Sequence, residues 1–354
     1  MHLSTSSFER PVVAGPWVRT FALALAVVVL VLGGLELFWR SQGHVPSVTD
    51  DPDLWAVERH RLLTGGDRTL VLIGASRLQV DVSTATLHTV LPEWRLVNLS
   101  VDGLHPLAVL KHVAEEDRFR GAVLCVITAP GFENRCHDEQ QSYVEHYLKH
   151  GTLNNRLNRN IATFLQWRLV VLDPYLKPMK LVPTVAESGK LPEPRYLIML
   201  PDRTRPADYL STDPDRHYRR RMARVRRVRS TRTPVPPDEW LTQALEIEPY
   251  VEEIQQRGGR VVFARFPTTR EHWTLDELDY PREQYWDRFA AATSADTLHF
   301  RDIEDMRGLD CPDGSHLDKR DTPAFTRALT REMIRLGVIR RESQVAPASP
   351  RPLP

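Results

Sequence analysis

The sequence predicts an α/β fold, a three-layer α/β/α arrangement in which a mainly parallel five-stranded sheet lies between two layers of helices. Short apolar runs typical of buried strands recur along the chain, and most are separated by stretches with helical character. Strands alternating with helices at this spacing indicate a parallel sheet that is covered on both faces. A large helical or irregular insertion interrupts the alternation, and an apolar segment lies near the N-terminus.

Three predicted strands precede the insertion and two follow it. The strands are expected at residues 69–73, 95–101, 121–128, 259–266 and 297–303. Helices are expected at residues 54–63, 80–90, 105–119, 237–256, 282–292 and 323–336. The hydrophobic fraction of 42% suits a globular protein with a core of its own.

The insertion, residues 136–236, holds two unusual segments. The first is an amphipathic helix with an apolar residue at every fourth position, namely Leu153, Leu157, Ile161, Leu165 and Leu169. A proline-rich, irregular region follows and contains the basic run RHYRRRMARVRRVRSTR at 216–232. This run could bind nucleic acid, acidic polymers, lipid headgroups or an anionic glycan; the simpler interpretation is a solvated helix face or loop.

An uncharged segment, FALALAVVVLVLGGL at 21–35, indicates a single membrane anchor. With its flanks it reaches about 20 residues, enough to cross a hydrocarbon layer of about 30 Å. Trp17 and Trp39 lie at its two ends, as interfacial aromatic residues do. A cleaved signal peptide is the alternative, although no small-x-small site follows the run. Arginines before the run favour a cytoplasmic N-terminus and an extracytoplasmic main domain, in the periplasm or at the cell surface.

The predicted organisation follows from these segments. It comprises a tail at 1–17, a transmembrane helix at 18–39, a juxtamembrane linker at 40–66, a domain in two parts at 67–135 and 237–340, the insertion between them, and a disordered tail at 341–354. Charge is balanced, with 47 Lys and Arg against 46 Asp and Glu, so no overall field argues for a nucleic-acid partner.

The three cysteines are informative if the domain lies outside the cytoplasm. Cys125 falls within an apolar strand and is expected to be a packed thiol. Cys136 and Cys311 both fall in loop-like stretches and could form a disulfide, but connectivity cannot be read from sequence.

The candidate chemistry begins with the serine in GASR at 74–77, directly after the first strand. Ligands of parallel sheets bind at the carboxyl ends of the strands, where Ser76 would lie, although a plain turn with a solvated serine is the alternative. A serine nucleophile needs a base and a group that holds the base. The segment CPDGSHL at 311–317 follows the fifth strand and offers Asp313 and His316, three residues apart across a glycine turn.

These two motifs, in this order and strand context, resemble those of the SGNH (GDSL-like) hydrolase superfamily. More narrowly, they resemble its membrane-anchored members linked to polysaccharide O-acetylation, the alginate-acetylation and DltD-like proteins, whose serine block often reads G-[SA]-S-R/E. The resemblance implies that Ser76 forms the acyl-enzyme, while Asp313 and His316 supply the acid and base. It covers about 67–135 and 258–336 and leaves the insertion unassigned.

The resemblance also implies oxyanion or substrate-binding roles for Gly103, Asn134 and Arg77. Gly103 ends NLSVDG at 98–103 and matches the family's second block, whose backbone N–H helps to bind the oxyanion. The third block normally reads G-x-N-D, whereas TAPGFEN at 128–134 places its glycine and asparagine at another spacing. If Cys136 and Cys311 paired, they would fix the loop of the base relative to this oxyanion region.

Other classes of site find little support. No G-x-S-x-G surrounds Ser76, which argues against an α/β-hydrolase elbow. Neither a glycine-rich phosphate loop nor a metal-spaced cluster is evident, so no cofactor and no metal are expected. His105, His137 and His146 are scattered and are interpreted as solvent-facing or helix-surface histidines.

The expected function is acyl transfer by a Ser-His-Asp triad to a sugar hydroxyl or to water, on a cell-envelope or exported polysaccharide. The first acceptor makes the protein an O-acetyltransferase and the second an acetylesterase. By resemblance, an integral membrane acyltransferase is the natural donor. A catalytically silent module that binds glycan or scaffolds an envelope complex is the alternative, and a nucleic-acid-binding role for 216–232 would require a cytoplasmic body.

Overall fold

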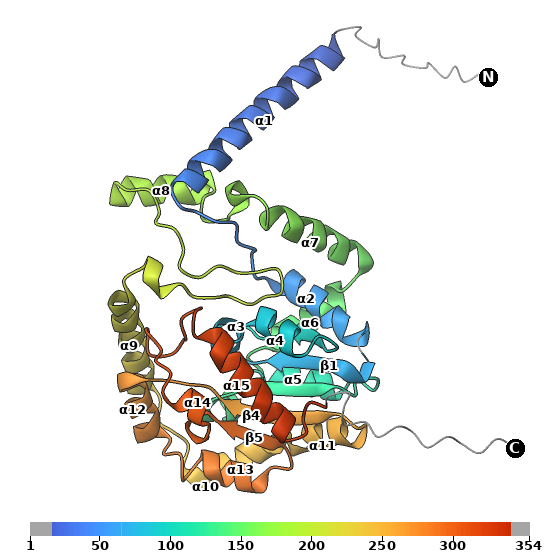
Figure 1. Ribbon diagram of the computed structural model, residues 1–354, viewed down its shortest axis with the longest axis vertical. Helices are drawn as coiled ribbons and strands as arrows, with labels where there is room; N and C mark the ends of the chain where they lie inside the picture. The colour runs from blue at the N-terminus through green and yellow to red at the C-terminus, as the bar shows by residue number, and fades with distance from the viewer. Residues whose placement is uncertain (1–15, 65, 341–354) are drawn as a thin grey trace, which may run out of the picture. The chain divides into compact units, whose positions relative to one another are not determined.

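The computed structural model describes residues 16–64 and 66–340, and its centre is one parallel sheet (Figure 1). The strand order is β2-β1-β3-β4-β5. The strands are β1 Thr69–Ile73, β2 Arg95–Asn98, β3 Ala122–Val126, β4 Arg260–Arg265 and β5 Asp296–His299. This order, with its switch at β1 and β3, is that of flavodoxin-like doubly wound sheets. The predicted α/β fold with a five-stranded parallel sheet is therefore confirmed.

Both faces of the sheet are covered, because side chains of a strand point alternately to opposite faces. In β1, Leu70 and Leu72 join one core cluster, and Val71 and Ile73 join the other. The first cluster is closed by α3 (Ser76–Asp81), α4 (Thr84–Val90) and α15 (Thr322–Arg335). The second is closed by α2 (Pro52–Arg61), α5 (Leu107–Ala114), α10 (Pro237–Ala244), α11 (Glu248–Gln256) and α13 (Trp286–Ala292). Three layers result.

Several elements are shorter than predicted, for local reasons. The fifth strand ends at His299, because the chain turns into a 3-10 helix at Phe300–Asp302, where the His299 Nδ1 accepts the N–H of Arg301 at 3.2 Å. The predicted helix 237–256 is two helices, α10 and α11, and Pro249 lies in the first turn of the second. Proline has no N–H to donate to a preceding turn, so it starts a helix more readily than it continues one.

The insertion is more helical than predicted. It contains α6 (Gln141–His150), α7 (Leu153–Gln166), α8 (Pro178–Ser188) and α9 (Pro214–Thr231). The amphipathic helix is present as α7, but its apolar side chains Leu157 and Ile161 are exposed. The basic run forms α9, which begins with Asp213 accepting the N–H of Arg216 at 3.1 Å and has Pro214 in its first turn.

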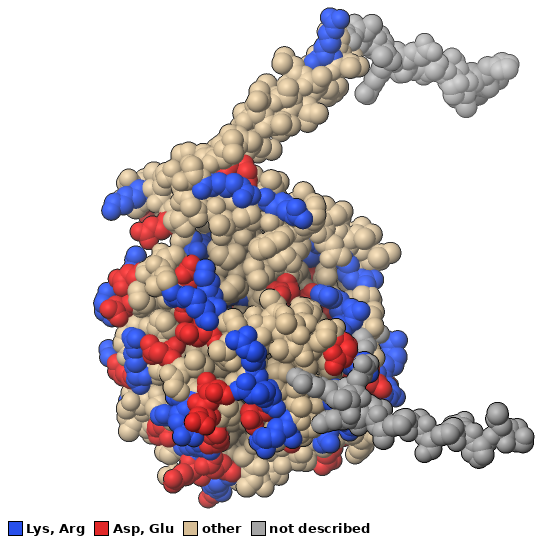
Figure 2. Space-filling model, viewed as in Figure 1, with Lys and Arg blue, Asp and Glu red and all other residues tan. Residues whose placement is uncertain are grey.

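Ion pairs hold α9 against α12 (Arg270–Asp279). Arg226 pairs with Glu271 at 2.6 Å and Arg229 with Asp279 at 2.8 Å. Figure 2 shows basic and acidic side chains intermixed on the side of the molecule where Figure 1 places these two helices. These pairs offset the repulsion between like charges three or four positions apart along α9.

The chain divides into two compact units, residues 1–45 with 169–194, and residues 46–168 with 195–354. The described part of the first unit contains α1 (Trp17–Ser41), the one described helix long and apolar enough to cross a membrane. The carboxylate of Glu36 accepts the N–H groups of Val170 and Val171 at 3.0 and 2.9 Å. Trp39 is buried at 4% exposure among residues of this unit, whereas the sequence predicted an interfacial ring.

The second unit is the α/β body. The predicted linker, 40–66, contributes α2 to this body, and the Trp55 ring of α2 is fully buried in the core. The predicted insertion is split, because only 169–194 falls in the first unit. The predicted tails at 1–15 and 341–354 lie outside the described residues.

Candidate active site

Ser76, His316 and Asp313 form a hydrogen-bonded chain at the carboxyl edge of the sheet. The Ser76 Oγ lies 2.9 Å from His316 Nε2, and His316 Nδ1 lies 3.0 Å from Asp313 Oδ2. Ser76 is the first residue of α3, and only Gly74 and Ala75 separate it from the end of β1. Asp313 and His316 are 1% and 4% exposed, whereas Ser76 is only partly buried. The sequence places these three residues at one site, and the structure brings their reactive atoms into contact.

A tight turn orients the histidine. Gly314 has a φ of +83°, a left-handed conformation that favours glycine. A Cβ at this position would lie 3.2 Å from a ring carbon of Tyr218. The turn lets Asp313 Oδ1 accept the N–H groups of Ser315 and His316 at 2.9 and 2.8 Å, while its Oδ2 faces the imidazole. One carboxylate therefore fixes both the backbone and the ring of the residue that follows.

Arg221 of α9 is a further member of this site that the sequence reasoning did not single out. Its Nε donates to Asp313 Oδ2 at 2.9 Å, and its Nη2 lies 3.0 Å from His316 Nδ1. The guanidinium thus stands beside the imidazole on the same carboxylate oxygen. The basic run contains many arginines, and its composition does not separate Arg221 from the others. The one sequence signal is helical spacing, which places Arg221 on the same face as Val225, Val228 and Arg232.

The Arg221 charge changes the protonation of the pair. Burial, and then the positive charge of Arg221, lower the pKa of His316 to about 4, against the opposing effect of Asp313. Burial alone would raise the pKa of Asp313, but His316, Arg221 and the Ser315 N–H hold it well below its usual range. The resting site therefore contains a neutral imidazole and a carboxylate at neutral pH, the state in which a histidine can accept a proton.

Gly103 and Arg77 both line the cavity above Ser76. Gly103 has a φ of +76°, and no heavy atom would come within 4 Å of a Cβ built there. Arg77 donates from Nε to Ser315 Oγ at 3.1 Å, so its guanidinium braces the turn that carries His316. Burial, and next the charge of Arg265, lower the pKa of Arg77 to about 10, so it stays cationic at neutral pH.

Asn134 is not part of the site, contrary to its predicted role. It lies in a 3-10 helix, Asn134–Cys136, and its side chain is exposed. Its N–H donates to Gln243 Oε1 at 2.9 Å and its Nδ2 donates to Glu246 Oε1 at 3.3 Å. The longer spacing after the third strand carries the asparagine past the cavity, which Thr128 and Pro130 line instead.

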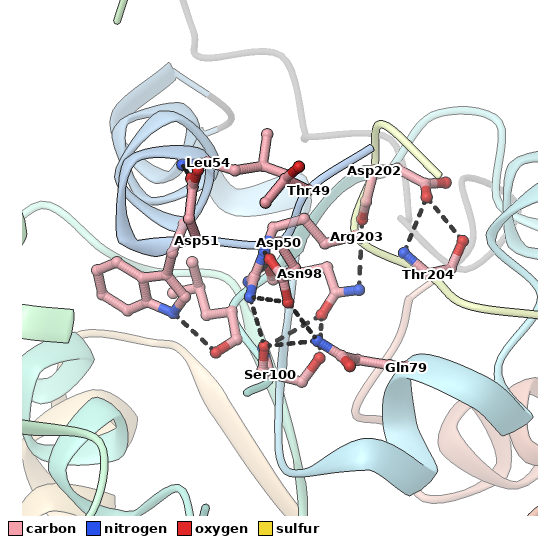
Figure 3. A network of polar contacts seen from close by, with 12 residues as sticks. Thr49, Asp50, Asp51, Leu54, Gln79, Asn98, Ser100, Asp202, Arg203 and Thr204 are labelled. Atoms are coloured by element: carbon pink, nitrogen blue, oxygen red, sulfur yellow. Dashed lines mark hydrogen bonds and ion pairs between the residues drawn. The ribbon is translucent and has the colours of Figure 1, made fainter. Parts of the chain in front are cut away.

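A buried polar network holds the segment that ends at Gly103 (Figure 3). The side chain of Arg203 is fully buried and donates to the carbonyl oxygens of Asn98 and Ser100, each at 2.8 Å. Its Nε also donates to Asp50 Oδ1 at 2.7 Å. Gln79 adds a second donor to the Ser100 carbonyl at 3.1 Å. These contacts join the insertion to the loop after β2, which positions Gly103 beside Ser76.

The three histidines predicted to be scattered have specific contacts. His105 lines the cavity, and burial, the largest influence, lowers its pKa. His137 Nε2 lies 3.0 Å from the Phe132 carbonyl oxygen, and His146 Nε2 lies 2.7 Å from Asp53 Oδ1. The prediction of a solvent-facing surface residue is therefore wrong for His105.

His105 belongs to a cluster of metal-ligating types with Cys136 and Glu139, whose ligand atoms lie within 4.8 Å of one another. Glu139 Oε2 accepts the His105 backbone N–H at 2.8 Å. Burial, and next the Glu139 charge, raise the pKa of the Cys136 thiol to about 12. At neutral pH the Cys136 side chain is therefore a protonated thiol. Metals bind the thiolate and not the thiol, so this cluster is poorly suited to a metal ion.

No disulfide joins Cys136 to Cys311, because all three cysteines are free and buried. Cys311 packs in the cluster closed by α15, where its Sγ lies 3.7 Å from the Pro267 carbonyl oxygen. Cys136 lies beside His105 and Glu139 instead. The loop of the base is therefore positioned by hydrogen bonds to Asp313 and Asp81, the latter accepting the Leu317 N–H at 2.9 Å.

A cavity of about 300 Å³ opens above Ser76. Its floor comes from the ends of β1 and β3 and from the loop at Gly103. One wall is α9, which contributes Arg221, Arg224, Val225 and Val228. The basic run of the sequence therefore faces the nucleophile.

Comparisons with known proteins found weak similarity to a solved structure, and no matching family model or curated protein. No family model matches the chain, and no curated protein matches it. Among solved structures, the crystal structure of TesA is similar over 76% of this chain and 99% of TesA, with 13% sequence identity and a TM-score of 0.30. None of these comparisons supports the narrower resemblance to polysaccharide O-acetylation proteins. A similarity of this size carries no argument, so the chemistry of the site is inferred from the contacts of Ser76.

Proposed function

We propose that the protein is an SGNH-like acyl-transfer enzyme that uses Ser76 as its nucleophile. The observation that supports this most directly is the chain from Ser76 Oγ to His316 Nε2 at 2.9 Å and from His316 Nδ1 to Asp313 Oδ2 at 3.0 Å. The strand order and the position of Ser76 after β1 agree with it.

In the proposed reaction, Ser76 attacks the carbonyl carbon of an acyl donor while His316 Nε2 takes the hydroxyl proton. Backbone N–H groups of Ser76 and Gly103 donate to the oxyanion of the tetrahedral intermediate. His316 returns the proton to the leaving group, and the acyl group stays on Ser76 Oγ. Water or a sugar hydroxyl, deprotonated by the same imidazole, then attacks the acyl-enzyme and releases Ser76.

The finer proposal places this chemistry outside the cytoplasm on a membrane-anchored protein. It rests on α1, whose mean hydropathy of 2.6 over 18 residues suits a membrane span. The acceptor would be a cell-envelope or exported polysaccharide and the donor an integral membrane acyltransferase, as the sequence resemblance implies. Protease accessibility of the body in sealed vesicles and in intact cells tests the topology.

Labelling with a fluorophosphonate tests the nucleophile. The full-length protein in detergent should acquire one label, located at Ser76 by peptide mapping, and Ser76→Ala should acquire none. Ser315→Ala is the matched control, because it removes another buried serine hydroxyl of the site that does not contact His316 Nε2. An unlabelled wild-type protein would leave the catalytically silent module as the better description, which the displaced Asn134 already favours over a fully equipped oxyanion site.

A further inference from the structure

Helix α9 presents one face to the cavity above Ser76. Arg221, Val225, Val228 and Arg232 recur at intervals of three or four residues along α9 and just past its end, so they follow one side of the helix. Arg224, one position before Val225, lines the cavity as well. Two valines lie between arginines along this face, so the wall that it makes is both basic and apolar.

The charges on this wall are unequally compensated. Arg221 is paired with Asp313 at 2.9 Å, and Arg229, which also lines the cavity, is paired with Asp279 at 2.8 Å. Among residues 16–64 and 66–340, Arg224 and Arg232 have no carboxylate within 4 Å. Within the described part of the chain, two guanidinium groups at the cavity therefore lack a counter-ion.

The acidic side chains of the cavity do not supply that counter-ion. Asp276 is bound by Arg265, with Nη2 donating to Oδ2 at 2.5 Å, and Asp279 is bound by Arg229. Burial is the main cause of the lowered pKa of His105, which also lines the cavity. The positive charge of Arg232 lowers this pKa further, because it disfavours a second positive charge nearby. The cavity therefore carries an excess of positive charge between α9 and the loop after β2.

We propose that this cavity selects acyl esters that carry an anionic group, a carboxylate or a phosphate, which binds Arg224 and Arg232 while the ester carbonyl lies at Ser76. This substrate class rests on the proposed acyl-transfer function and specifies it. Guanidinium groups bind both anions through paired N–H donors, and these two lie on the same wall of the cavity. An uncharged ester would leave both guanidinium groups without a partner.

Two matched pairs of chromogenic esters test the proposal with the full-length protein in detergent. The first pair places the charge on the acyl side, comparing mono-4-nitrophenyl glutarate with 4-nitrophenyl butyrate. The second places it on the leaving group, comparing 3-carboxy-4-nitrophenyl acetate with 4-nitrophenyl acetate. We expect the anionic member of at least one pair to have a kcat/KM about tenfold higher, mainly through KM, and the preference to shrink at high salt.

Charge-reversal variants connect this preference to α9. The double variant Arg224→Glu with Arg232→Glu should abolish or reverse the wild-type preference, mainly by raising KM for the anionic ester. Arg227→Glu is the control for a single arginine-to-glutamate change, made on an exposed residue of α9 that does not line the cavity. Each single variant, Arg224→Glu and Arg232→Glu, is compared with it directly. Equal rates within both pairs for the wild type, or a preference that survives the double variant, would overturn the proposal.

A binding measurement separates this proposal from the acyl-transfer function itself. Ser76→Ala is titrated calorimetrically with monomethyl glutarate, methyl butyrate and inorganic phosphate, so turnover is not needed. Tighter binding of monomethyl glutarate or phosphate, lost in the Arg224/Arg232 double variant and kept in Arg227→Glu, supports the anion site even if no ester is hydrolysed. Equal binding of the charged and neutral esters, with no binding of phosphate, overturns it even if fluorophosphonate labels Ser76.

Discussion

The cavity has two sides built in different ways. The sheet edge means Ser76 with Asp313 and His316, of which the last two are buried and Ser76 is partly buried. Ser76 follows β1 closely, and Asp313 and His316 lie in the turn at Gly314. The α9 wall, meaning the cavity-lining face of residues 221–232, belongs to a helix whose only buried residue is Met222. On the proposed function, the sheet edge would make and break the acyl bond, and the α9 wall would set the charge and shape of the cavity. The difference teaches that chemistry and selectivity would then come from separate parts of this chain.

Removing the nucleophile should have the largest effect, because only the sheet edge can form the acyl-enzyme. Ser76→Ala should lower kcat on 4-nitrophenyl acetate by about 10⁴ or more, and His316→Ala by a similar factor, since members of a triad act as a unit. The double variant should lose no more than either single variant. Additive losses in the double variant would show that the two residues do not act together.

Removing Arg203, the buried arginine that holds the segment ending at Gly103, should have the next largest effect. This effect is on the free energy of unfolding. Arg203→Met removes the cation paired with Asp50 and the Arg203 donors to the Asn98 and Ser100 carbonyl groups, and Gln79 remains as a donor to Asp50 and Ser100. The free energy of unfolding should fall by about 3 kcal/mol. Urea unfolding followed by tryptophan fluorescence measures this change. Arg227→Met removes an exposed arginine as a control and should change stability by less than about 0.5 kcal/mol.

Removing Arg221 should shift the pH profile and so measure how strongly the α9 wall acts on the sheet edge. With a His316 pKa of about 4, the acid limb of kcat/KM should fall near pH 4. Arg221→Met removes a charge that disfavours imidazolium, so the limb should move to higher pH, while burial of His316 keeps its pKa below the ordinary value of histidine. Arg221→Lys keeps the charge and should keep a lower limb. An unchanged limb in Arg221→Met would mean that α9 does not influence the base.

The smallest effect is expected at Asn134, which the sequence resemblance places in the site and the structure places outside it. Asn134→Ala should leave kcat/KM within about twofold of wild type, because its side chain contacts Glu246 rather than the cavity. Loss of a true oxyanion donor costs about 10²–10³ in kcat. A loss of that size would return Asn134 to the site.

The parts of the molecule that the sequence predicts correctly depend on short-range patterns. β1 and β3 are continuous apolar runs, and Ser76 lies in the turn just after β1. His316 lies in a separate D-x-x-H turn, beyond β5 and the short helix α14 (Glu304–Arg307). Each pattern fits in about ten residues, and parallel strands bring their carboxyl ends to one edge. Fold and triad could therefore be predicted together, since one implies the place of the other.

The parts that could not be predicted depend on distant pairings. Arg221 contacts Asp313 across 92 residues, and Arg203 contacts Asp50 across 153 residues. An arginine in a basic run gives no local sign of its partner, so a solvated face was the simplest interpretation of 216–232. The exposure of the apolar face of α7 could not be predicted for the same reason. Periodicity predicts which residues share a face of a helix but not which part of the molecule covers that face.

The separation of Ser76 from His316 by 240 residues also governs when the chain becomes reactive. A ribosome delivers the serine early and the imidazole among the last residues of the domain, and chains generally fold as whole domains. Until β5 and the turn at Gly314 are in place, Ser76 is an ordinary alcohol that no base can deprotonate. On the proposed function, a nascent chain therefore could not acylate itself or its neighbours before the sheet is complete.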